Sequence, residues 1–192
     1  MKKYIFILMV ILMFCGKTAW ADDQAVVQMA LWHPVQLFPD DYNVTGLRLD
    51  LIYGDNDNVS GLDLGLVNRV KGDLKGYEGG FINLVHGSAY GIQEASTVNV
   101  VDGDFYGLQD GFGNGVGGDF RGVQFGVING VKGDFTGLQA GLFFNHVDGE
   151  MRGLQIGILN LADSLDGVQI GLLNFTNKSN PLGFCPIVNL SF

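Results

Sequence analysis

A pattern of about fifteen residues repeats through most of the chain. A glycine followed by an apolar residue, and in the later copies by a glutamine, returns at intervals of 14 to 16 residues. These marker glycines are Gly46, Gly61, Gly76, Gly91, Gly107, Gly122, Gly137, Gly153 and Gly167. Self-similarity at a short, regular period is typical of architectures in which each unit stacks on its neighbour. The pattern therefore predicts nine structural repeats over residues 46–178.

Each unit predicts a short β-strand, as in residues 121–135, "RGVQFGVINGVKGDF". Apolar residues at the first, third and fifth positions after the marker glycine alternate with the period of a strand. A second glycine near position four argues against a helix, because each glycine in a helix costs roughly 1 kcal/mol relative to alanine. We expect one strand over "GLQxGL", a turn at the asparagine that follows, an extended piece around "GDF", and burial of about four apolar side chains.

Two all-β arrangements fit such units. In a β-solenoid, neighbouring units run parallel about 4.8 Å apart, and the glutamine and asparagine columns form ladders of side-chain amides. In an antiparallel β-meander or an outer-membrane β-barrel, the natural period is a hairpin of two units. Successive units here do not alternate, so we expect a solenoid of about nine coils with caps over residues 22–45 and 179–192. The alternating end "PIVNLSF", which resembles the last strand of bacterial outer-membrane barrels, keeps the barrel as the alternative.

The N-terminus has the pattern of a Sec-type signal peptide over residues 1–21. Two lysines precede an apolar run, and Ala19 and Ala21 place small residues at the positions that a signal peptidase recognises. The run is about 12 residues long, too short for a membrane-spanning helix of about 20. Phe14 before Cys15 argues against a lipoprotein signal. We therefore expect export to the periplasm, the outer-membrane surface or the extracellular space.

The net charge and the cysteine content bear on the partners and on the stability of the exported chain. The net charge is −9, and loss of the signal would remove further lysines, so the exported chain is strongly acidic and would repel nucleic acid and anionic lipid. Cys185 is the only cysteine beyond the signal, so no internal disulfide is expected, and we expect it to be a small buried hydrophobe. Stability then depends on packing and backbone pairing.

The repeated "GLQIGLxN" unit, the segment "HPVQLFP" and the closing "PIVNLSF" resemble the leptospiral-type surface repeat family of exported bacterial proteins. The resemblance covers nearly all of the chain after the signal. It implies a location and an architecture, and it implies no enzymatic activity.

The sequence predicts no catalytic or metal-binding residues. His33 lies in the expected cap, and His86 and His146 belong to coils four apart, so the three are not expected to share a metal. The glycine-rich "GNGVGG", residues 113–118, precedes no helix that could bind a phosphate. Acidic residues at one repeat position are interpreted as solvated turn residues, with weak calcium binding as an alternative: Asp73, Asp104, Asp119, Asp134 and Glu150.

These observations favour an exported, non-enzymatic repeat protein of the bacterial cell envelope or surface, without a cofactor. Its role would be structural, or it would bind an unidentified protein or glycan. No nucleic-acid partner is expected, and membrane association stays open. The alternative is an outer-membrane barrel or pore. An enzyme on a solenoid scaffold is disfavoured because the repeat columns are glutamine, asparagine and glycine.

Overall fold

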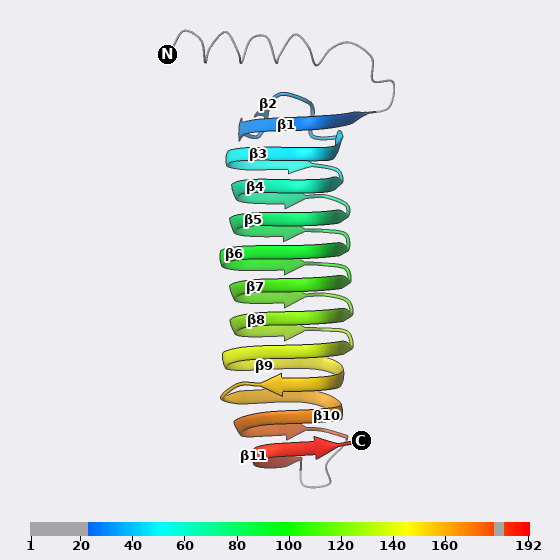
Figure 1. Cartoon of the computed structure of the whole chain (residues 1–192), viewed down its shortest axis with the longest axis vertical. Coiled ribbons are helices and arrows are strands. Elements are labelled where there is room, and N and C mark those ends of the chain that lie inside the picture. Colours follow the sequence, from blue (N-terminus) through cyan, green and yellow to red (C-terminus); the bar gives the residue numbers. More distant parts are fainter. Residues whose placement is uncertain (1–22, 179–182) are drawn as a thin grey trace.

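The computed structural model describes residues 23–178 and 183–192, and over these residues the chain is a rod of stacked β-coils (Figure 1). The predicted signal peptide lies outside the described residues. Eleven strands form one coiled sheet. The strands are β1 (Gln24–Trp32), β2 (Val35–Gln36), β3 (Asn43–Asn56), β4 (Val59–Val70), β5 (Leu74–Val85), β6 (Ala89–Val101), β7 (Phe105–Val116), β8 (Phe120–Val131), β9 (Phe135–Ile156), β10 (Leu159–Thr176) and β11 (Phe184–Ser191).

Neighbouring repeats run parallel and in register. Between β7 and β8 the marker glycines Gly107 and Gly122 lie opposite each other, and the glutamines and asparagines of the two repeats are aligned in the same way. The same parallel pairing joins every successive pair from β3 to β10. The predicted β-solenoid is therefore confirmed, and the antiparallel meander or barrel is wrong.

The two ends of the rod are built differently. Strand β1 lies parallel to β3, with Gln28 opposite Arg48, so stacking already begins within the segment expected to be the N-terminal cap. The short β2 then pairs antiparallel with β1. At the other end β11 pairs antiparallel with β10. Cys185 lies in β11 and is half-buried, so the prediction of a buried cysteine is wrong.

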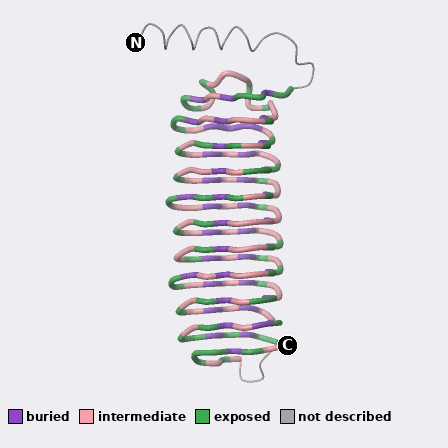
Figure 2. Tube along the Cα trace, in the orientation of Figure 1, coloured by how far each residue is buried: buried purple, intermediate pink, exposed green. Residues whose placement is uncertain are grey.

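The interior of a typical coil, such as that of β8, contains two apolar and two amide side chains, not four apolar ones. Figure 2 shows the buried positions recurring from coil to coil. The first apolar column precedes the marker glycine by two residues and consists of Val44, Val59, Leu74, Ala89, Phe105, Phe120, Phe135, Met151 and Leu165. The second ends each strand from β4 to β8, continues within β9 and β10, and consists of Val70, Val85, Val101, Val116, Val131, Val147 and Ala162. Phe120 stacks between two phenylalanines, with ring centroids 5.0 and 4.7 Å away.

Between β4 and β9 a turn follows the second apolar column of each repeat, whereas β9 continues past Val147 to Ile156. Strand β8 continues from Phe120 through Asn129 to Val131, so the turn predicted at the asparagine is wrong. The chain changes direction within the strand instead, at the marker glycine. Gly122 has a φ of 138°, and a Cβ at this position would lie 1.9 Å from the carbonyl oxygen of Gly107. Only glycine fits such a corner without strain, which explains its recurrence.

Candidate binding surface

The glutamines of the repeats face inward and bond to one another. From Gln109 to Gln169 each side-chain Nε2 donates to the Oε1 of the glutamine in the preceding coil, at 2.7 or 2.8 Å. Each of these glutamines is fully buried. Because every amide is partnered along the rod axis, burial leaves little unmet hydrogen-bonding demand. The glutamine column is thus a structural element and is not available to a ligand.

The asparagines form a second internal ladder of opposite direction. From Asn68 to Asn160 each Nδ2 donates to the Oδ1 of the asparagine in the following coil, at 2.8 to 3.0 Å. Asn129, for example, also donates to the carbonyl oxygen of Ala140 at 3.0 Å. Both predicted amide ladders are therefore confirmed, and both lie inside the rod.

Charged residues replace the glutamines at the N-terminal end of their column. Arg48 is fully buried and donates through Nε and Nη2 to both carboxylate oxygens of Asp63, at 2.7 and 2.5 Å. Its Nη1 donates to the carbonyl oxygen of Arg69 at 2.8 Å. Glu78 accepts a hydrogen bond from Gln93 at 2.7 Å and so joins this group to the glutamine ladder.

Two carboxyl groups of this buried group have raised pKa values. Burial raises the pKa of Asp50 to about 7, although the positive charge of Arg48 opposes the shift. Burial, with the nearby charge of Asp63, also raises the pKa of Glu78 well above its usual value. The Nε of Arg48 lies 3.1 Å from Asp50 but donates its hydrogen to Asp63. Both carboxylate oxygens of Asp50 therefore lack a hydrogen bond among the described residues. The group lies inside the rod, and only Asp50 borders a surface depression, the one lined by Leu49 and Leu51.

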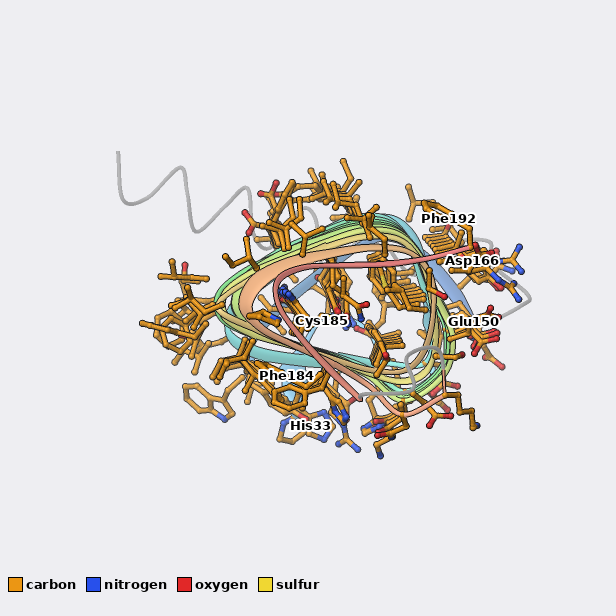
Figure 3. The ribbon with its side chains drawn as sticks, turned by 90° about the horizontal axis from the view of Figure 1, so that it is seen from below. His33, Glu150, Asp166, Phe184, Cys185 and Phe192 are labelled. Carbon is orange, nitrogen blue, oxygen red and sulfur yellow. The ribbon has the colours of Figure 1, made fainter. Side chains whose placement is uncertain are left out.

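The acidic turn residues support the turn itself. Asp104, Asp119 and Asp134 each accept a hydrogen bond from the backbone N–H of the same position in the next coil, at 2.8 or 2.9 Å. Asp73 does the same for Ser88 at 2.9 Å. In Figure 3 the labelled Glu150 lies at this charged end of the cross-section. These contacts support the interpretation as turn residues, and no three of the column form a metal-sized cluster within residues 23–178 and 183–192.

One long side of the rod exposes apolar side chains, which we call the apolar side. It comprises the third and fifth positions after the marker glycine, where exposed fractions run from 36 to 65%. Its members are Leu51, Leu64, Leu66, Phe81, Phe112, Phe125, Leu142, Ile156, Ile158, Ile170 and Leu172. Figure 3 shows outer side chains that are mostly carbon away from the charged end. The alternating apolar positions of the sequence therefore face solvent, contrary to the expectation that such residues fill the interior.

The apolar side is hollowed near both ends and polar in the middle. A shallow depression over the last coils is lined by Leu142, Ile156, Ile170, Leu172 and Ile187. A second depression at the other end is lined by Met29, Leu31, Val35, Leu37, Leu49, Leu51 and Leu64. Between them Glu94 and Asp110 occupy the third position. Glu94 accepts a hydrogen bond from the Tyr77 hydroxyl at 2.8 Å.

The three histidines lie apart, as the repeat spacing predicts, but each is close to a carboxylate. His86 lies 2.6 Å from Asp102, and His146 lies 3.2 Å from Asp148, and both pairs are exposed. His33 belongs to a group of three potential metal ligands, a group that the sequence analysis missed. No spacing motif marks it, because its members come from different loops and strands.

Neither the glycine-rich motif nor similarity to known proteins indicates a further site. The "GNGVGG" segment lies at the end of β7 and in the following turn, away from any helix. Within the described chain, no helix has the length and hydropathy needed to cross a membrane. No family model, curated protein or solved structure matches this chain.

Proposed function

We propose that this chain is an exported, non-enzymatic scaffold of the bacterial cell envelope that binds a partner protein along its apolar side. The observation that supports this most directly is the exposure of eleven leucine, isoleucine and phenylalanine side chains on one long side of the rod. Exposed apolar surface of this extent, here in patches near both ends of the rod, is typical of a protein–protein interface. The resemblance to exported surface repeat proteins and the signal-peptide pattern support the location.

The chemistry of the apolar side favours a protein over a glycan. Aliphatic side chains such as Leu142 and Leu172 offer no hydrogen bonds, whereas sugar hydroxyls need polar partners beside any aromatic surface. The net charge of −9 opposes close approach to an anionic lipid surface. A partner with a complementary apolar surface, such as the face of another β-sheet, fits both features.

The absence of an enzymatic role is part of the same proposal. The internal polar columns are engaged in amide ladders, and the turn carboxylates are engaged with backbone N–H groups. Outside these columns, the exposed pairs formed by His86 and His146 lie on different coils. Acid–base chemistry would require such groups to converge on one substrate position.

Site-directed photo-crosslinking in cells tests the proposal. A photoreactive residue at position 142, in place of Leu142, is expected to give a crosslinked species of one defined mass. The matched control places it at Lys132, which is also exposed and lies in the turn after β8. Equal crosslinking from both positions, or none from position 142, would contradict binding through the apolar side.

Cell fractionation tests the location separately. The processed protein is expected in the periplasmic or released fraction, or bound to the outer membrane and extractable with salt or urea. Extraction that requires detergent would indicate insertion into the bilayer and would contradict the scaffold proposal.

A further inference from the structure

A histidine and two aspartates converge at the N-terminal end of the rod. His33 follows β1, Asp40 lies between β2 and β3, and Asp55 lies near the end of β3. One potential ligand atom from each lies within 4.8 Å of the others. Figure 3 shows His33 outside the coiled ribbon, so this residue of the group lies on the flank of the rod.

Two atoms of this group are buried and lack a hydrogen-bond partner among the described residues. They are Nδ1 of His33 and Oδ1 of Asp55. Asp55 as a whole is only 3% exposed. A buried acceptor without a partner is costly, and a bound cation would satisfy both atoms at once. This is an observation independent of the clustering itself.

Two nearby basic side chains each bind one carboxylate oxygen of the group and leave the other oxygen available to a metal ion. Lys71 donates to Oδ2 of Asp40 at 2.6 Å, and Arg69 donates to Oδ2 of Asp55 at 3.3 Å. Each carboxylate therefore keeps its second oxygen. Lys71 also lies 3.7 Å from Asp57, so it can remain paired if Asp40 turns toward a metal.

We propose that His33, Asp40 and Asp55 form a zinc site that joins the N-terminal cap to the first coil of the repeats. Imidazole nitrogen together with carboxylate oxygen is a zinc ligand set, whereas calcium takes oxygen ligands in larger number. Zinc bonds of about 2.1 Å in tetrahedral geometry place ligand atoms about 3.4 Å apart, so a pair that lies 4.8 Å apart closes by about 1.4 Å. His33 and Asp40 are half-exposed and can make this movement. Water completes the coordination.

The site has a structural consequence. Asp55 belongs to a strand of the rod, whereas His33 and Asp40 belong to the segment that covers its end. A metal bound by all three residues would fasten the cover to the stack and hinder the terminal coil from opening. This role is independent of the partner proposed for the apolar side.

The test is zinc titration of the purified chain without a histidine tag, by calorimetry and by thermal unfolding. We expect one zinc ion per chain and a melting temperature that rises with zinc concentration. His33→Gln and Asp55→Asn are each expected to weaken binding at least tenfold and to abolish the rise. Because Asp55 is buried, its variant could unfold, and His33→Gln on the exposed flank then carries the test alone.

The double variant His86→Gln/His146→Gln is the matched control. It removes the other two histidines and their exposed aspartate pairs, and it is expected to bind zinc like the parent chain. Absence of zinc binding in the parent, binding unchanged in His33→Gln, or loss of binding in the control variant would each overturn the proposal.

Discussion

Replacement of one glutamine in the middle of the internal ladder tests what stabilises this interior. Gln124 donates to Gln109 and accepts from Gln139, both at 2.8 Å. In Gln124→Leu, the Oε1 of Gln109 and the Nε2 of Gln139 lose their partners in a fully buried environment. At about 1–3 kcal/mol for each orphaned group, the free energy of unfolding should fall by about 2–6 kcal/mol.

The assay is equilibrium urea unfolding followed by circular dichroism, with the slope of the transition checked for constancy. Lys132→Gln is the control, since Lys132 is exposed in the turn that follows β8. A surface change of this kind is expected to alter stability by no more than about 0.5 kcal/mol.

A double variant makes the test sharper. Gln109→Leu and Gln124→Leu each orphan two amide ends, but the double variant also orphans only two, on Gln93 and Gln139. Its cost should therefore be close to that of one single variant. Strictly additive costs, or a Gln124→Leu variant as stable as the parent chain, would refute the view that the ladder acts as a connected unit.

Three further changes have defined outcomes in the same unfolding assay. Gly122→Ala should be severely destabilising, because its Cβ would meet a carbonyl oxygen at 1.9 Å, whereas Gly130→Ala, whose Cβ would meet nothing nearer than 4.0 Å, should be neutral or slightly stabilising. Phe120→Ala removes the centre of a fully buried ring stack and should cost about 3–5 kcal/mol. The pKa of Asp50 is raised to about 7 in the folded chain, whereas an aspartate of the unfolded chain loses its proton near pH 4. The free energy of unfolding should therefore fall as the pH rises from about 4 to about 7. Asp50→Asn should remove the part of this fall that Asp50 causes and leave the part caused by Glu78, and a pH profile unchanged by the substitution would contradict the assignment.

The stacking of this protein could be predicted from its residues alone. A period near fifteen without alternation between odd and even copies requires identical surroundings for each copy, and parallel coils in register provide them. The aligned Gln109 and Gln124 then follow from the same register. The position of the turn was not predicted correctly, because Asn129 has the composition of a turn residue but lies within a strand.

Which side of each strand faces inward was decided only by the tertiary structure. A period-two pattern assigns residues to two faces of a strand but does not say which face points into the rod. Here the apolar Leu142 is exposed, whereas the polar Gln139 is fully buried. Stacking reverses the usual preference for apolar residues in the interior, because a buried amide can form hydrogen bonds to its copies in the coils above and below. The sequence of a single coil does not contain these partners. The group formed by His33, Asp40 and Asp55 likewise exists only after folding, because the end of the rod brings together residues from three separate segments.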